Sequence, residues 1–90
     1  MADGLFKEAK IWRLPEPVLG CAHRFKYRLA LIANDQCVLR YDNERGKGDH
    51  KHVDGVEAPV VFVDLKTLLA DFHRDIHAWR RAHDYTDDSR

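Results

Sequence analysis

The sequence has few of the residues that are typical of secreted and membrane-spanning proteins. It contains two cysteines, Cys21 and Cys37, which do not form a Cys-x-x-Cys pair and have apolar neighbours. We expect free thiols packed in a core, with a structural disulfide as the alternative. No apolar run approaches the length of a bilayer span, and no basic stretch followed by a hydrophobic one opens the chain. These absences predict a protein without membrane contact and favour the cytoplasm.

The chain also lacks net charge, because 15 Lys and Arg balance 15 Asp and Glu over 90 residues. It has no long-range attraction for nucleic acid, so any RNA contact must come from a local patch. Basic residues outnumber acidic ones between Arg24 and His52, whereas the segment from Asp84 to Asp88 is acidic. The length predicts one domain over residues 1–90 with a modest core, which a homodimer or a hetero-oligomer would stabilise further. We expect the polar residues 84–90 to be frayed.

Alternation of apolar and polar residues predicts an antiparallel sheet. Between Phe25 and Ala33 every second residue is apolar, and Lys26 and Arg28 lie on the opposite face. The segment from Cys37 to Asp42 alternates in the same way. Leu5 to Leu14 is a weaker strand candidate, ended by two prolines that lack the amide hydrogens a continuing strand would need.

The turn between the two alternating segments is predicted from their register. A two-residue turn at Asn34-Asp35 would put Arg40 across from Leu29 and mix polar with apolar faces. A three-residue turn that includes Gln36 keeps the faces separate and aligns these pairs: Leu29 with Tyr41, Leu31 with Leu39, and Arg28 with Asp42. Because one residue of slip moves every side chain to the opposite face, a clean core face favours the longer turn. Four residues then share one surface: Lys26, Arg28, Arg40 and Asp42.

The next residues predict two more strands. Asp49 to Val53 is expected to return through the loop Arg45-Gly46-Lys47-Gly48, whose glycines let the backbone approach a phosphate. Asp54-Gly55 predicts a tight turn, and Val60 to Val63 is expected to form a short strand after Pro59. His50 and His52 share a face because they are two apart in a strand. The loop does not fix whether this is the face of Arg40.

A C-terminal helix is predicted after Asp64, whose carboxylate can accept hydrogen bonds from otherwise unpaired amides. Apolar residues recur at steps of three and four: Leu65, Leu68, Leu69, Phe72, Ile76 and Trp79. This stripe is expected to cover the apolar face of the strand that begins at Phe25. The fold class is therefore α+β, with an antiparallel sheet of four to five meander strands and one C-terminal helix packed on one face.

The segment Arg40–His52, with the sequence RYDNERGKGDHKH, has the residue types that RNA cleavage needs. It holds four cations and two of the six histidines. Metal-independent cleavage requires a base for the 2′-hydroxyl proton, an acid for the leaving oxygen, and cations around the phosphorane. All three types are present here. A solvated hairpin loop is the alternative, because loops are usually polar whatever they do.

The sequence resembles the TumE-like toxins of bacterial toxin-antitoxin modules. The resemblance rests on four segments: Trp12–Pro17, His23–Leu29, Arg40–His52 and the helix opening Leu65–Phe72. It covers about residues 11 to 75, and the Arg-Tyr-Asp-Asn run followed by closely spaced histidines is its most specific part. It implies a growth-inhibiting toxin with a small DNA-binding antitoxin and suspected RNA cleavage. The segment before Ile11 is shorter than the family pattern, so the resemblance leaves room for a missing edge strand.

The residues themselves predict roles within this segment. His50 and His52 are candidates for proton transfer, since an unperturbed imidazole titrates near about 6.5. Asp42 or Glu44 would orient the imidazole, and Lys47 completes the candidate catalytic set. The expected substrate-binding cations are Lys26, Arg28, Arg40 and Arg45.

Each candidate also has a simpler explanation. His50 and His52 could form cross-strand hydrogen bonds, or bind a metal with Asp42 as third ligand, although no further Cys or His has a recognised zinc spacing. Arg28 and Asp42 could be an ordinary cross-strand ion pair. His73 and His77 lie one helical turn apart but lack additional ligands.

The leading hypothesis is a toxin that cleaves RNA, a suspected endoribonuclease that needs neither a cofactor nor a metal. Its expected partners are RNA and a cognate helix-turn-helix antitoxin, and no membrane. One alternative is a non-catalytic module that binds protein or RNA. Another is a metal-dependent enzyme that uses His50 and His52.

Overall fold

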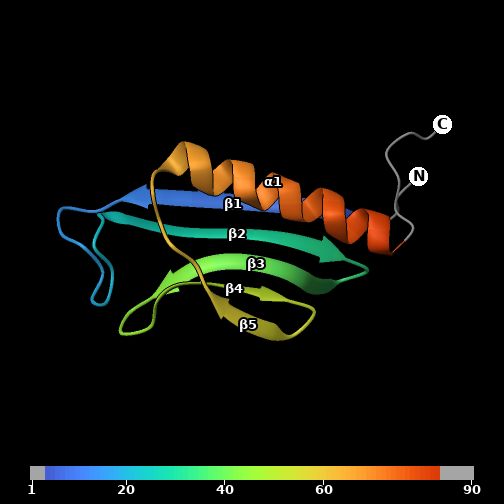
Figure 1. The fold of residues 1–90 in the computed structure, drawn as a ribbon, viewed down its shortest axis with the longest axis horizontal. Helices are drawn as coiled ribbons and strands as arrows, with labels where there is room; N and C mark the ends of the chain where they lie inside the picture. Colours follow the sequence, from blue (N-terminus) through green and yellow to red (C-terminus); the bar gives the residue numbers. More distant parts are fainter. Residues whose placement is uncertain (1–3, 84–90) are drawn as a thin grey trace.

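The computed structural model describes residues 4–83, which form a five-stranded sheet and one helix. The elements follow in order: β1 (Leu5–Arg13), β2 (Phe25–Ala33), β3 (Gln36–Glu44), β4 (Gly48–Val53), β5 (Val56–Pro59) and α1 (Leu65–Ala82). Each strand pairs antiparallel with the next, so the sheet is a meander (Figure 1). The predicted α+β fold is confirmed. The predicted fraying of residues 84–90 lies outside the described residues.

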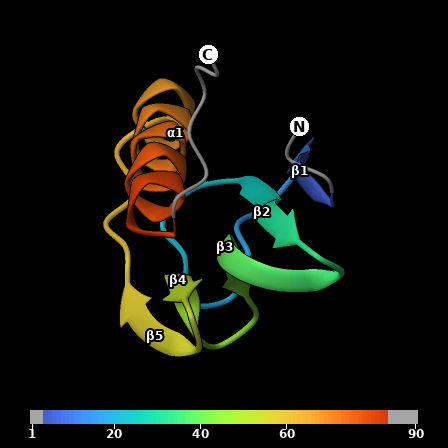
Figure 2. The ribbon, with the colours of Figure 1, turned by 90° about the vertical axis from the view of Figure 1, so that its right-hand side faces the viewer.

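The sheet is curved, and α1 lies in the hollow of the curve over the middle strands (Figure 2). The two layers enclose the core, whose buried members are Tyr27, Leu29, Leu31, Ala33, Leu39, Tyr41, Leu68, Phe72, Ile76 and Trp79. The helix therefore covers the sheet face that alternation predicted. The opposite face has no helix over it and carries the polar residues of the strands.

The hairpin between β2 and β3 has the predicted register but not the predicted turn length. Only Asn34 and Asp35 lie between the strands, with φ of 51° and 67°. Two positive φ values are typical of a type I′ turn, whose twist matches that of the strands. The register then shifts by a β-bulge: Ile32 pairs with Cys37, but Leu31 pairs with Leu39. The bulge leaves Val38 without a Cα partner and restores the separation of faces that the longer turn was meant to provide.

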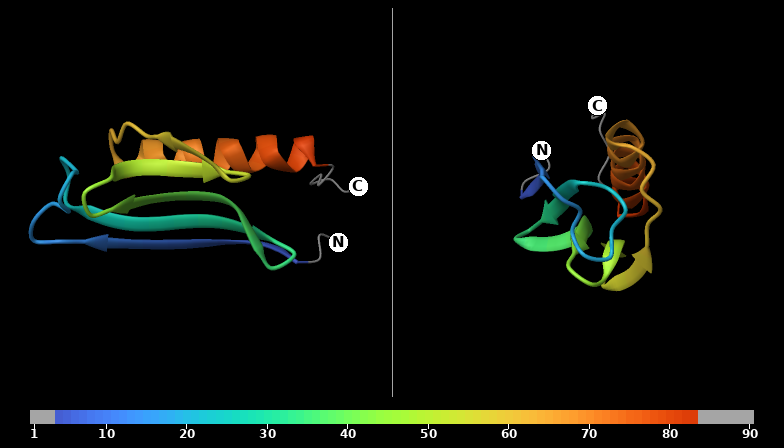
Figure 3. Two further views of the ribbon diagram at one scale, coloured as in Figure 1. Left: turned by 90° about the horizontal axis from the view of Figure 1, so that it is seen from below. Right: turned by 90° about the vertical axis from the view of Figure 1, so that its left-hand side faces the viewer.

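The last strand lies earlier in the chain than predicted. The Asp54-Gly55 turn joins β4 directly to β5, whereas residues 60–63 form no strand. Val60 donates one more hydrogen bond to Asp49, and the chain then leaves the sheet edge to reach the helix (Figures 1 and 3). An apolar run was therefore wrongly assigned to the sheet, because it bridges two layers instead. Phe62 packs into the core end, while Val61 and Val63 stay exposed.

Polar side chains stabilise the first end of the helix and connect the other end to the sheet. Asp64 caps α1 as predicted, accepting from the Thr67 amide at 2.7 Å, and this bond lowers the pKa of its carboxyl. Near the other end, the indole of Trp79 donates to Asp54 at 3.0 Å. The helix orientation is thus set by polar contacts as well as by its apolar stripe.

Strand β1 is present at the sheet edge, so the chain is not missing the edge strand that its short N-terminal segment left in doubt. Eight of its nine residues are exposed, because α1 lies over the strands further along the sheet. Cys37 is exposed as well, which contradicts its expected core position, and both cysteines are free thiols. Within residues 4–83, no helix has the length and apolar character needed to cross a membrane.

Candidate functional site

The register of β3 and β4 answers the question that the loop left open. His50 pairs with Asp42, and His52 pairs with Arg40. All four side chains therefore point to the same side of the sheet, opposite the helix. On β5, Glu57 pairs with His52 and joins them. We call these five residues, with the neighbouring Glu44 and Lys47, the histidine cluster.

His50 lies at the centre of this cluster and is nearly sealed, with 4% of its side chain exposed. Its Nδ1 lies 3.1 Å from the carbonyl oxygen of Gly48. Its Nε2 lies 2.8 Å from Asp42 Oδ1, 3.4 Å from Glu44 Oε1 and 3.9 Å from Glu57 Oε2. Although 2.8 Å is a close contact, the angles are not those of a hydrogen bond, and both Nε2 and Oδ1 are buried without a partner. Three carboxylates thus face one unsatisfied imidazole nitrogen.

The remaining cluster residues balance much of the charge around His50. Arg40 Nε lies 3.1 Å from the second oxygen of Asp42. Lys47 Nζ lies between Glu44 and Glu57, at 3.6 Å and 3.5 Å. His52 is more open than His50, with 26% of its side chain exposed, and the two rings meet edge to face at 5.2 Å. The site is compact and has both signs of charge.

Glu57 was not predicted as a site residue, although the sequence contained the necessary information. A two-residue turn at Asp54-Gly55 requires Val53 to pair with Val56, and His52 then faces Glu57. The incorrect strand at 60–63 concealed this pairing. The Asp54-Gly55 turn is therefore the sequence feature that predicts Glu57 beside His52.

The glycine loop before β4 is already occupied by protein rather than open to a phosphate. The amide of Gly46 donates to the carbonyl of Leu19 at 2.7 Å. At Gly48, with φ of 75°, an added Cβ would lie 3.0 Å from the carbonyl oxygen of Gly20. The loop backbone was expected to approach a phosphate, but it packs against the segment before β2 instead.

The predicted substrate-binding cations differ in how free they are. Arg28 lies opposite Asp42 in the β2–β3 register, but the Asp42 carboxylate contacts Arg40 and His50 instead. Arg28 forms no ion pair among residues 4–83. Arg45 is exposed and likewise has no ion-pair partner in this part of the chain. Lys26 is tethered, because its Nζ donates to the Asn43 carbonyl at 2.6 Å. Arg28 and Arg45 are thus the cations best able to take a new anion.

A second polar cluster lies on the helix side of the sheet and contains His23. The ring accepts from the Phe25 amide at Nδ1, so Nε2 carries the hydrogen and donates to Asp49 at 2.8 Å. Tyr27 donates to the same carboxylate at 2.6 Å, and burial, followed by this bond, raises the pKa of the Tyr27 phenol. Burial also raises the pKa of the nearby Cys21 thiol, and Asp49 adds to the effect. The side chains of His23, Tyr27 and Asp49 are all hydrogen-bonded, which indicates that this cluster has a structural role.

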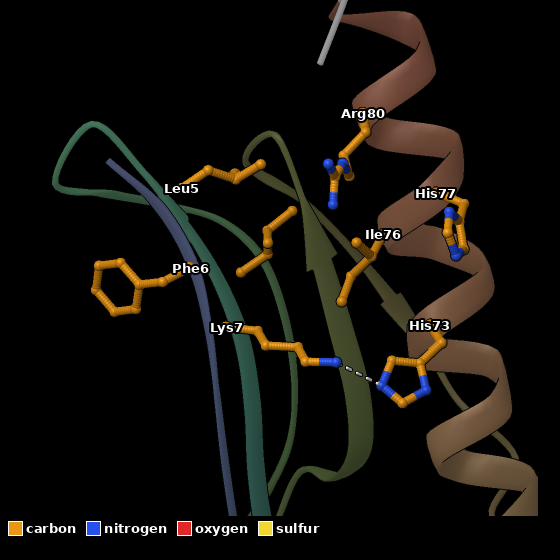
Figure 4. Close-up of a pocket in the computed structure, with 8 residues that line it drawn as sticks. Leu5, Phe6, Lys7, His73, Ile76, His77 and Arg80 are labelled. Carbon is orange, nitrogen blue, oxygen red and sulfur yellow. Dashed lines mark hydrogen bonds between the residues drawn. The ribbon is translucent and has the colours of Figure 1, made fainter. Parts of the chain in front are cut away.

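A groove of about 410 Å³ separates β1 from the last turns of α1. Its lining consists of Leu5, Phe6, Lys7, Leu31, His73, Ile76, His77 and Arg80. Figure 4 shows Lys7 reaching across the groove, where its Nζ donates to His73 Nε2 at 3.1 Å. This bond occupies the His73 nitrogen, and the lining residues include no carboxylate. The groove is therefore cationic around an apolar floor and is poorly suited to a metal at His73 and His77.

These features define a small α+β protein whose curved sheet is covered by one helix and carries a cluster of histidines, cations and carboxylates on its other face. The family model described as Toxin TumE matches residues 2–80, and the chain belongs to that family. This match confirms the resemblance found in the sequence. It identifies the chain as a member of a toxin family and implies an antitoxin partner. No curated protein and no solved structure matches the chain.

Proposed function

We propose that this toxin inhibits growth in the cytoplasm by cleaving RNA on the sheet face opposite the helix. One observation carries the proposal: Arg40, Asp42, His50 and His52 converge on that face through the register of β3 and β4. Arg28, which forms no ion pair among residues 4–83, lies opposite the same Asp42 in the β2–β3 register and is therefore beside these residues. Proton-transfer groups and phosphate-binding groups are thereby adjacent, as RNA cleavage requires.

The proposed reaction needs no group beyond the RNA and the protein. The 2′-hydroxyl oxygen attacks the adjacent phosphorus while a base removes its proton. The bond from phosphorus to the 5′-oxygen breaks, and an acid returns a proton to that oxygen. The products are a 2′,3′-cyclic phosphate and a 5′-hydroxyl end. Arg28 and Arg40 stabilise the additional negative charge on the phosphorane.

The exposures of the two histidines separate their roles. His52 is the more open of the two, so it is the candidate for proton exchange with the RNA. His50 is a positioning residue, because 4% side-chain exposure gives it little contact with a substrate. It packs against Asp42, whose other oxygen lies 3.1 Å from Arg40 Nε. Lys47 forms ion pairs with Glu44 and Glu57, so it can contact the RNA only if these two ion pairs break.

An exposed aromatic ring supports RNA binding beside the cluster. Trp12 is 48% exposed and pairs in register with Lys26, so both side chains lie on the proposed RNA face. Stacking of a base on an exposed indole contributes about 1–3 kcal/mol in proteins that bind single strands. The RNA is expected to run from Trp12 past Arg28 to His52.

The test is inducible expression of the wild type and of His52→Ala, with growth and RNA integrity followed together. The wild type should arrest growth and produce RNA fragments that end in cyclic phosphate. His52→Ala should leave RNA intact and allow growth, while thermal melting shows that it still folds. His77→Ala, an exposed histidine on α1, is the matched control. Growth arrest without RNA decay would reject the nuclease, and arrest by His52→Ala would reject this site.

A non-catalytic binding module is the second candidate, and the ion pairs of the cluster favour it. Arg40 and Lys47 already have carboxylate partners, as the charges of a structural network do. This alternative predicts that the purified toxin binds RNA or protein and leaves RNA intact with and without divalent metal. Incubation of labelled RNA with the toxin distinguishes the two.

The antitoxin is proposed to be a small helix-turn-helix protein whose acidic segment enters the groove between β1 and α1. The support is charge complementarity, because Lys7, His73 and Arg80 surround an apolar floor. The neighbouring β1 is exposed along most of its length and can be covered by the same partner. A toxin-antitoxin hetero-oligomer would follow, and a homodimer through β1 is its competitor.

A further inference from the structure

The tautomer of His50 is determined by its backbone contact. A carbonyl oxygen can only accept a hydrogen bond, so the Nδ1 that lies 3.1 Å from the Gly48 carbonyl must carry a hydrogen. A neutral imidazole has one ring hydrogen, which leaves a lone pair on Nε2. That lone pair faces the oxygens of Asp42, Glu44 and Glu57 at 2.8, 3.4 and 3.9 Å. In this neutral tautomer the lone pairs repel one another, so a cation bound among them would stabilise the arrangement.

The cluster at His23 shows the contrasting case. There Nδ1 accepts from the Phe25 amide, Nε2 carries the hydrogen, and the carboxylate of Asp49 receives it at 2.8 Å. That histidine and carboxylate satisfy each other without any additional charge. Both clusters bring a histidine and a carboxylate within 2.8 Å, but only at His50 is the nitrogen left without a hydrogen bond. The need for a cation is therefore specific to the sheet face opposite the helix.

We propose that His50, Asp42 and Glu44 bind one first-row divalent cation, and that the half-exposed Glu57, 3.9 Å from His50 Nε2, moves closer to become a fourth ligand. The ligand atoms of the first three lie within 4.8 Å of one another. A zinc ion with bonds of about 2.1 Å separates tetrahedral ligands by about 3.4 Å, which is close to the observed spacing around His50 Nε2. One imidazole with three carboxylates suits Zn²⁺ or Mn²⁺.

The surroundings of these ligands are those of a metal site. The Nδ1–H of a metal-bound histidine usually donates to a backbone carbonyl, as His50 does to Gly48. Arg40 contacts the second oxygen of Asp42 at 3.1 Å and can hold that carboxylate in place. His50 is almost completely buried, so the ring is fixed before the cation arrives.

Lys47 is the natural competitor of the cation. Its ammonium lies 3.5–3.6 Å from Glu44 and Glu57, the two exposed carboxylates of the set. With 54% of its side chain exposed, it can withdraw into solvent when a divalent ion binds. The exchange would add positive charge to the face where RNA binding is proposed. That consequence depends on the proposed nuclease function, whereas the cation site itself does not.

The experiment is calorimetric titration of the full-length toxin with ZnCl₂, and separately with MnCl₂ and MgCl₂. We expect one Zn²⁺ per chain, weaker Mn²⁺ binding, and the weakest binding for Mg²⁺. His50→Gln should abolish binding. Glu44→Gln changes a half-exposed side chain while keeping its size, and it should weaken binding by at least about tenfold. Circular dichroism confirms that each variant is folded.

Two further variants give the site a specific signature. Lys47→Gln should tighten Zn²⁺ binding, because it removes the competing ammonium, whereas Lys66→Gln on the exposed side of α1 should leave it unchanged. His23→Gln should also retain the ion. No saturable binding by the folded wild type would overturn the proposal, as would undiminished binding by His50→Gln and Glu44→Gln. Binding lost only in His23→Gln would overturn it too, because the ion would then lie in the other cluster.

RNA cleavage measured in the same samples separates the two proposals. Zn²⁺ binding without RNA cleavage leaves the cation site intact and rejects the nuclease. Cleavage by a toxin that binds no metal rejects the cation site and leaves the nuclease intact.

Discussion

Tyr41 in the middle of the sheet donates its phenolic hydrogen to Asp75 of α1 over 2.5 Å. Lys51 of β4 reaches the same carboxylate oxygen at 3.0 Å and also lies over the Tyr41 ring. One helix carboxylate therefore joins two neighbouring strands to the second layer. This contact lies on the core side of β3, directly behind the histidine cluster. The strand that carries Arg40 and Asp42 is thus fixed from its other face.

Tyr41→Phe should lower the free energy of unfolding by about 1.5–3 kcal/mol, the range for a hydrogen bond to a charged group. The ring stays in the core, so the loss reports the hydroxyl alone. Urea denaturation measures it. Lys51→Gln should cost less, because its side chain is 30% exposed and solvent screens the ion pair. Equal stability of Tyr41→Phe and the wild type would show that Asp75 finds another partner.

The two buried tyrosines predict a loss of stability at high pH. Burial raises the pKa of Tyr27 and of Tyr41, and hydrogen bonds to Asp49 and Asp75 raise both further. The folded protein therefore keeps these protons at a pH where the unfolded chain releases them. Stability is complete below the unfolded pKa of about 10 and falls as the pH rises above it. Thermal melting from pH 8 to pH 11.5 should show this fall, and a smaller fall for Tyr41→Phe.

Asn43 should be indispensable to the pairing of β2 with β3. It is fully buried, accepts from the Tyr27 amide at 3.0 Å and donates to the Phe25 carbonyl at 2.6 Å. Asn43→Ala would leave these two backbone groups unpaired, at about 1–3 kcal/mol for each. A fall in Tm greater than that of Tyr41→Phe is expected by calorimetry. A smaller fall would mean that water replaces the amide.

Arg28→Ala should weaken RNA binding and reduce its dependence on salt. Each phosphate contact with a single strand contributes about 0.7 to the slope of log K against log salt. Removal of one unpaired guanidinium should reduce the slope by about that amount, as measured by fluorescence anisotropy. Arg74→Ala, a change on α1 at an arginine paired with Asp71, is the control and should leave the slope unchanged. An unchanged slope for Arg28→Ala would exclude it from the RNA path.

Lys7→Glu should weaken binding to the antitoxin by reversing one charge of the groove. The side chain spans the groove to His73, so an acidic partner would meet repulsion there. Copurification and calorimetry with the antitoxin measure the effect, and growth arrest should become harder to relieve. Lys10→Glu changes the same charge on β1, but on the face turned away from the helix. Equal loss in both variants would indicate contact with the sheet edge rather than with the groove.

The strands and the helix were predictable because each buries one face. Alternation identified β2 to the residue, and steps of three and four identified the apolar stripe of α1. The register of β2 and β3 followed from the same requirement, because only one alignment keeps Arg40 and Asp42 out of the core. The turn length did not follow, since a two-residue turn with a bulge and a three-residue turn give the same faces.

The residues of the candidate site could be proposed from the sequence, whereas their arrangement in space could not. Sequence proximity brought His50, His52 and Asp42 into one hypothesis. Whether the histidines share a face with Asp42 depends on the residue at which β4 begins after Glu44. The sequence of the glycine loop does not determine that residue. The role of Asn43 was not predictable, because a buried amide that bonds to strand backbone follows no periodic pattern. Residues 60–63 were misassigned because apolar composition does not distinguish a strand from a crossing between layers.

The bulge at Val38 determines which changes in length the β2–β3 hairpin can tolerate. The bulge contributes one residue to β3 without a Cα partner on β2. Deleting that residue alone would remove the bulge and keep the pairs that follow, with Leu39 still opposite Leu31 and Arg40 still opposite Ala30. Deleting a second residue from the same strand would place Arg40 opposite Leu31 and turn it into the core, because no unpaired residue is left to absorb the change. In related toxins, this strand should therefore be found with or without the bulge residue, but not shorter by two.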